Sequence, residues 1–169
     1  TYWATNESWA PGAKEPTFTF KKFMKEYNNP ADTTIGSSFV SFFGDDSTLM
    51  SYCYDGNMRA VTYEDDRYVA VDSFKVRQLP FRPITPSFFN YTRSILRYAL
   101  ETKDSIIKEV KDYGDSVYFG LTIQEDRQVE FFGKAFHMEK TPYDFGEPTS
   151  RYELWINKSN DLPYYVRRE

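Results

Sequence analysis

The chain has 169 residues, 40% of them hydrophobic and 27% charged, with a formal net charge of −4. This length suits about one domain with a real core, and the composition excludes a disordered chain. The negative charge argues against nucleic acid as a partner, because phosphates require a basic surface. No apolar run approaches the ~20 residues of a membrane-spanning helix.

Aromatic residues make up 19% of the chain, which favours a β-rich fold because aromatic side chains suit pleated, half-buried surfaces. Residues 1–16 contain Pro11, Gly12 and Pro16 and show no clear period. We therefore expect an irregular N-terminal lead-in over 1–16 and a single folded domain over 17–169. The next segment, "TFTFKKFMKEYNN", permits either a strand or a short helix.

Four short β-type runs follow, and polar turns separate them. The runs are "SSFVSFF", "TLMSYCY", "NMRAVTY" and "RYVAVDSF". The second run ends at Asp55-Gly56, among the strongest hairpin signals. This spacing predicts an antiparallel meander.

A helix interrupts the strands at residues 86–101. Thr85 is a suitable N-cap and Pro86 suits the first helical position. Apolar residues from Phe88 onward follow helical spacing and form one stripe. The pattern predicts one amphipathic helix that lies against the sheet.

β-type runs resume after the helix. "SIIKEVKDY" turns at Gly114-Asp115 into "SVYFGLTI", and "VEFFGKAFHMEK" is predicted to be one strand with Gly133 as a candidate bulge. The closing "RYELWINKSNDLPYYVRRE" predicts a hairpin. The order predicts an α+β fold in which one strongly curved antiparallel sheet, an incomplete barrel, wraps around one main helix.

The sequence contains little that indicates catalysis. Its one histidine, His137, lies on a predicted strand, where a packed or surface role is the ordinary interpretation. A hydrolase would need His137 to act with Glu130 or Glu139, which the sequence places on the same strand. Cys53 has no basic neighbour, which predicts an inert thiol. We predict no catalytic residue, no metal site and no cofactor.

Two explanations of the aromatic content remain open. The rings fill the core between sheet and helix, or they line an apolar cavity that holds an acyl chain or another hydrophobic ligand. The first is the more ordinary explanation. The candidate cavity residues are Phe39, Phe42, Tyr52, Tyr54 and Phe74.

Three segments carry a family resemblance. "DTTIGSSFVSFF", "FFNYTRSILRYALETKDSI" and "YELWINKSNDLPYYVRRE" resemble the N-terminal domain of Gram-negative envelope lipoproteins that carry a C-terminal thioredoxin module of the TlpA/ResA type. The closing "WINKSNDLPYYVR" also resembles the end of the LolA/LolB-like superfamily. The resemblance spans about residues 30 to 169. Its motifs are structural rather than catalytic.

The resemblance implies a LolA-like half-barrel, a location in the periplasm or cell envelope, and a lipid anchor through a removed N-terminal signal. The redox chemistry of a thioredoxin module needs two neighbouring thiols, whereas this chain has only Cys53. A thioredoxin-like domain is therefore expected beyond Glu169.

The resulting expectation is a non-catalytic envelope domain that binds a hydrophobic ligand or a partner, accessory to that redox domain. The alternatives are a purely structural interaction domain with a self-filled core, and a hydrolase that uses His137.

Overall fold

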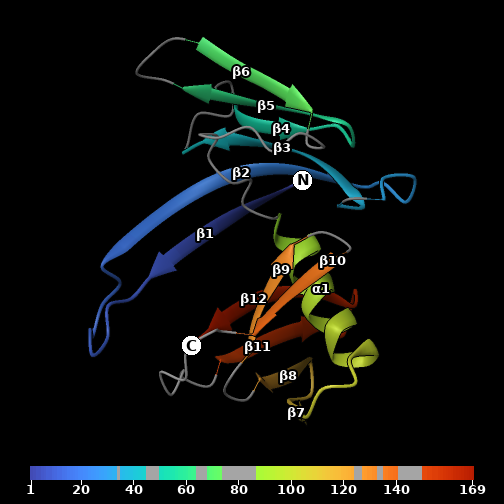
Figure 1. Ribbon diagram of the computed structural model, residues 1–169. Helices are drawn as coiled ribbons and strands as arrows, with labels where there is room; N and C mark the ends of the chain where they lie inside the picture. The colour runs from blue at the N-terminus through green and yellow to red at the C-terminus, as the bar shows by residue number, and fades with distance from the viewer. Residues whose placement is uncertain are drawn as a thin grey trace. The chain divides into compact units, whose positions relative to one another are not determined.

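The computed structural model describes residues 1–33, 35–44, 50–63, 68–73, 87–123, 127–132, 135–140 and 150–169. The chain divides into two compact units, Thr1–Phe88 and Phe89–Glu169. In the described residues, antiparallel strands form three sheets, and a single helix accompanies them (Figure 1). The fold is therefore α+β and mostly β, without a closed barrel among these strands.

The first unit contains a six-stranded antiparallel sheet in which every strand pairs with its neighbour in sequence (Figure 1). This order confirms the predicted meander and extends it by two strands at its N-terminal side. The strands are β1 (Tyr2–Ser8), β2 (Phe18–Asn28), β3 (Ser37–Phe43), β4 (Met50–Tyr54), β5 (Met58–Tyr63) and β6 (Tyr68–Ser73).

The turn between β4 and β5 shows why the sequence signal was reliable. The Asp55 carboxylate accepts hydrogen bonds from the backbone N–H groups of Asn57 at 2.8 Å and Met58 at 2.7 Å. Gly56 has a φ of 109°, a left-handed conformation that glycine adopts without strain. These bonds also hold the pKa of the Asp55 carboxyl below its usual value. The side chain and the glycine together fix the hairpin.

The prediction of an irregular lead-in over residues 1–16 is wrong. Strand β1 pairs with β2 along its whole length, from Tyr2 opposite Met24 to Ser8 opposite Phe18. The proline and glycine residues that suggested irregular structure lie in the connection after β1, where Gly12 has a φ of 77°. The ambiguous segment after it is a strand, because β1 and β3 both bond to it.

The second unit contains a four-stranded sheet packed against the helix. The sheet has the order β12-β11-β8-β7, and the helix α1 spans Phe88–Glu101. The predicted helix 86–101 is thus confirmed over most of its length, while Thr85 and Pro86 lie outside the described residues. The four strands are β7 (Ile106–Asp112), β8 (Ser116–Ile123), β11 (Ser150–Asn157) and β12 (Leu162–Arg168).

The core of this unit lies between α1 and the strands β8 and β11. Apolar stripes on the helix and on both strands meet there, as the alternation in "SVYFGLTI" and "YELWI" requires. The prediction that the helix lies against a sheet is confirmed. The buried members of the core are Ile95, Tyr98, Ala99, Leu121, Ile123, Tyr152 and Leu154.

The segment "VEFFGKAFHMEK", predicted as one strand, contains a pair of strands. β9 (Arg127–Phe132) and β10 (Ala135–Lys140) pair antiparallel, with Ala135 directly opposite Phe132. Gly133, the candidate bulge, lies outside the described residues. This pair forms a sheet of its own, so the described strands do not make up one continuous sheet.

No helix in the described part of the chain is long and apolar enough to cross a membrane.

Candidate functional site

One face of the six-stranded sheet presents apolar side chains to solvent. Directly opposite residues of paired strands share a face, so the register puts Trp3, Phe23 and Phe42 in one row. The ring centroids are 5.1 Å apart for Trp3–Phe23 and 5.7 Å apart for Phe23–Phe42. We call this side the apolar face. Its members are Trp3, Phe23, Tyr27, Val40, Phe42, Cys53, Met58, Ala60, Val69 and Val71.

Much of this face is open. Trp3 is 52% exposed, Tyr27 61% and Val71 58%, while Phe23 and Phe42 are half-buried. Contiguous exposed apolar surface of this kind marks an interaction site more often than scattered exposed residues do. The apolar face is therefore the leading candidate for a binding surface in the first unit.

Two lysines lie on the same face of β2. Lys21 is opposite Thr5 and Lys25 is opposite Val40, and both are exposed. The Lys25 ammonium lies 5.6 Å from the centroid of the Phe42 ring, a cation–π arrangement. The aromatic row thus has cationic groups beside it, an arrangement suited to a ligand with an apolar body and an anionic end.

The predicted cavity residues are divided between the two faces. Phe39 and Tyr54 lie on the opposite face from Phe42, are 1% and 2% exposed, and have ring centroids 5.8 Å apart. Tyr52 packs edge-on against Phe39, also at 5.8 Å, and burial raises the pKa of its hydroxyl to about 12. Phe74 lies outside the described residues. Phe39, Tyr52 and Tyr54 therefore fill space with one another, whereas Phe42 is half-buried on the apolar face.

Trp3 and Phe23 were missed as site candidates. The cause was the interpretation of residues 1–16 as irregular, which removed the strand that places Trp3 beside Phe23. The signal was present in "TYWATNES", where Tyr2, Ala4 and Asn6 are half-buried and alternate with exposed Trp3 and Thr5.

No protein-family model, curated protein or solved structure matches this chain.

The residues considered for hydrolysis are arranged differently from the expectation. Glu130 lies on β9, directly opposite His137 on β10, rather than on the same strand. Glu139 is on the strand of His137. Among the described residues, no group of three or more histidine, cysteine, aspartate or glutamate side chains could hold a metal ion. Cys53 is a free thiol on the apolar face.

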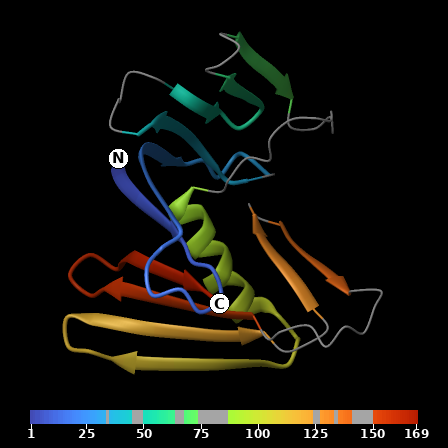
Figure 2. The ribbon, with the colours of Figure 1, turned by 90° about the vertical axis from the view of Figure 1, so that its left-hand side faces the viewer.

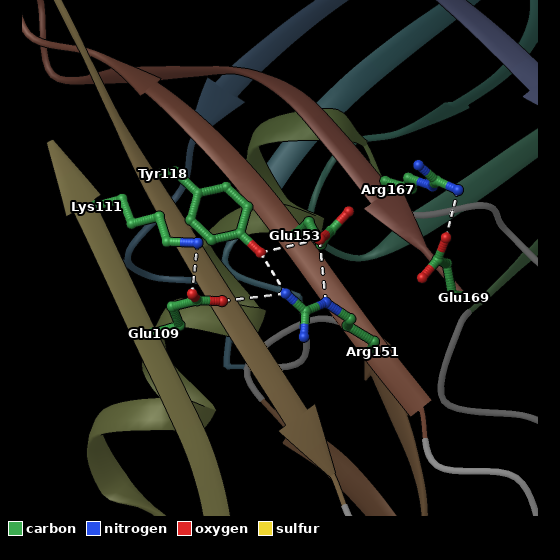
Figure 3. A network of polar contacts seen from close by, with 7 residues as sticks. All are labelled: Glu109, Lys111, Tyr118, Arg151, Glu153, Arg167 and Glu169. Carbon is green, nitrogen blue, oxygen red and sulfur yellow. Dashed lines mark hydrogen bonds and ion pairs between the residues drawn. The ribbon is translucent and has the colours of Figure 1, made fainter. Parts of the chain in front are cut away.

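A polar network covers one face of the four-stranded sheet (Figure 3). Arg151 Nη2 donates to the Tyr118 hydroxyl at 2.7 Å and to Glu109 Oε2 at 3.1 Å. Arg151 Nε donates to Glu153 Oε1 at 3.0 Å, and the Tyr118 hydroxyl donates to the same oxygen at 2.9 Å. Lys111 Nζ completes the network 2.6 Å from Glu109 Oε1.

Electrostatics in this network favour the charged forms of the acids. A hydrogen bond from Lys111, aided by Arg151, lowers the pKa of the Glu109 carboxyl. Partial burial acts to raise the pKa of the Glu153 carboxyl, but hydrogen bonds from Tyr118 and Arg151 lower it overall. Burial and the neighbouring Glu153 raise the pKa of the Tyr118 hydroxyl. These bonds join strands β7, β8 and β11 across one face of the sheet.

The network holds the Tyr118 ring over Gly120. A Cβ at position 120 would lie 2.8 Å from the Tyr118 hydroxyl oxygen and 3.3 Å from the ring. We expect Gly120→Ala to displace the ring, break the bonds to Arg151 and Glu153, and lower the free energy of unfolding by about 1–2 kcal/mol. Urea denaturation measures this change.

The matched control is Gly120→Ala in a Tyr118→Ala background. With the ring gone, alanine at position 120 should be neutral or stabilising, because glycine weakens a strand. An equal loss of stability in both backgrounds would contradict the arrangement.

Proposed function

We propose that this chain is a non-catalytic binding domain whose apolar face takes a hydrophobic ligand with an anionic end, such as a long-chain fatty acid. The observation that carries the proposal is the aromatic row of exposed Trp3 and half-buried Phe23 and Phe42, with a lysine ammonium beside it. An acyl chain would cover the rings, and its carboxylate would pair with Lys25 or Lys21.

The burial of Phe39 and Tyr54 supports this location over a cavity on the other face. Those rings already contact each other, so an acyl chain there would have to displace packed core side chains. On the apolar face, Trp3 and Tyr27 are already 52% and 61% exposed. Covering apolar surface favours binding, by about 0.8 kcal/mol for each CH2 group of the acyl chain that leaves water and by part of the about 1.5–3 kcal/mol that full burial of a side chain contributes.

The test uses Trp3 as the reporter in a Trp9→Phe, Trp155→Phe variant, where it is the remaining tryptophan. A brominated long-chain fatty acid should quench its fluorescence saturably. We expect Lys25→Glu to weaken binding about tenfold, because it reverses the charge that meets the carboxylate, and Phe42→Ser to weaken it as much by removing the central ring. Native mass spectrometry of the purified chain should find co-purified lipid.

The matched control is Leu100→Ser, which removes an apolar side chain that is 83% exposed but lies on the helix of the second unit. Its affinity for the fatty acid should be unchanged. Quenching that does not saturate, together with no co-purified lipid, would contradict the binding of a hydrophobic ligand by this chain. Equal affinity in the parent and both test variants would place the ligand elsewhere.

The proposal also includes a LolA-like half-barrel, a periplasmic or envelope location, and an accessory role beside a thioredoxin-like domain of the same polypeptide. What supports these points is the resemblance of the segments around "DTTIGSSFVSFF" and "WINKSNDLPYYVR" to envelope lipoproteins. The sequence of the complete gene tests the redox part. A C-x-x-C pair within a βαβ pattern is expected, and a complete gene without one would contradict it.

A further inference from the structure

Strand β7 lies at an edge of the four-stranded sheet. Within the described residues it pairs with β8 alone, and Figure 2 shows it as the yellow strand with no strand on its outer side. Three large apolar side chains on or next to it are open to solvent: Ile107 is 55% exposed, Val110 68% and Tyr113 59%. An edge with such side chains is a ready template for pairing with another strand.

The hydrogen-bonding pattern of the β7–β8 hairpin determines which backbone N–H and C=O groups of β7 point away from the sheet. The Tyr113 N–H donates to the Ser116 carbonyl at 2.9 Å, which makes Tyr113 and Ser116 a hydrogen-bonded pair. Bonding alternates along an antiparallel ladder, so the backbone groups of Lys111 and Glu109 also turn toward β8. The N–H and C=O groups of Asp112, Val110 and Lys108 therefore point away from the sheet.

The side-chain order of β7 is self-complementary in one register. When two copies of β7 pair antiparallel about a two-fold axis at Val110, Glu109 lies opposite Lys111 and Lys108 lies opposite Asp112. In the same register Ile107 meets Tyr113, and the outward backbone groups of Lys108, Val110 and Asp112 find partners. A two-fold axis at Lys108, Glu109 or Lys111 would instead place that charged residue directly opposite its own copy, which is unfavourable.

We infer that β7 is a self-association edge. It binds β7 of a second copy of this chain in an antiparallel pair centred on Val110, which joins the two four-stranded sheets into one. The charged groups are already held at the edge, since Lys111 lies 2.6 Å from Glu109 and Lys158 lies 2.6 Å from Asp112. The two-fold register adds ion pairs between copies to these ion pairs within each copy. This surface lies in the second unit and does not depend on the proposed ligand.

Cysteine cross-linking tests the register. In a Cys53→Ser background, Val110→Cys should form a disulfide-linked dimer under mild oxidation, because paired residues have Cα atoms about 5.5 Å apart. Lys108→Cys is the control. Its two copies would lie about 13 Å apart along the strands and should not cross-link. Adding Asp112→Cys to Lys108→Cys should restore the cross-link.

Charge reversal tests the association itself by sedimentation over a range of concentrations. Lys108→Asp places like charges opposite each other at both symmetric positions and should weaken dimerisation at least about tenfold. The exchange Lys108→Asp with Asp112→Lys should restore it. Lys14→Asp, which makes the same charge change at an exposed position in the first unit, should have no effect.

Two results would overturn the inference. The parent chain could sediment as a monomer at every concentration, or Val110→Cys and Lys108→Cys could cross-link equally well.

Discussion

Replacing Leu154 by alanine is expected to lower the free energy of unfolding by about 3 kcal/mol, within the range of about 2–5 kcal/mol for buried leucines. Leu154 is 0% exposed and belongs to the cluster that joins α1 to strands β8 and β11. Its truncation removes apolar burial and leaves a cavity between helix and sheet, which close-packed neighbours such as Ile95 and Leu121 cannot fill without strain. Chemical denaturation of the purified chain measures the loss.

The matched control for this substitution is Leu162→Ala on strand β12. Leu162 is 48% exposed, so the same change there should cost less than about 1 kcal/mol. Comparable losses at both positions would mean that the core does not lie between α1 and the four-stranded sheet.

Replacing Asp32 by alanine is expected to destabilise the first unit by about 3 kcal/mol. Asp32 is 6% exposed, and its Oδ2 atom accepts hydrogen bonds from the backbone N–H groups of Ile35 at 3.1 Å and Gly36 at 2.9 Å. The Tyr54 hydroxyl donates to the same oxygen at 3.2 Å. Alanine would leave these buried donors without this acceptor, and each costs about 1 kcal/mol or more. Thermal unfolding monitored by circular dichroism measures the effect.

Two further variants test this explanation. Tyr54→Phe removes one donor and should cost only about 1 kcal/mol, because the backbone donors keep their acceptor. Glu15→Ala removes an exposed carboxylate and should be neutral. If Asp32→Ala costs no more than Tyr54→Phe, the carboxylate does not organise the chain between β2 and β3.

The sequence predicted the secondary structure well wherever local signals decided it. Alternating apolar residues correctly predicted β8, with Leu121 and Ile123 buried, and the Asp55-Gly56 turn correctly predicted the β4–β5 hairpin. The secondary structure predicted from local residues was wrong in two segments. Pro11 and Gly12 belong to a turn, but they obscured β1 before them, and "VEFFGKAFHMEK" was predicted as one strand where β9 and β10 form an antiparallel pair.

The candidate site was harder to predict because faces depend on register. Phe39 and Phe42 are three residues apart on one strand, so alternation already puts them on opposite faces, and a shift of register between Ser41 and Phe42 brings Met50 opposite Phe42. Such a shift is not visible in the sequence. Trp3 joins the site by pairing with Phe23, twenty positions along the chain, which one sequence without relatives does not specify.

The six-stranded and the four-stranded sheet differ in how far apart in the sequence their paired strands lie. Every strand from β1 to β6 pairs with the next one made, so the first sheet can form while the ribosome is still adding later residues. The central pair β8–β11 joins Ser116–Ile123 to Ser150–Asn157, so its loop can close only after Asn157 has been synthesised. The six-stranded sheet can therefore form before the second unit, and α1 gains its complete four-stranded partner only once β11 and β12 have been made.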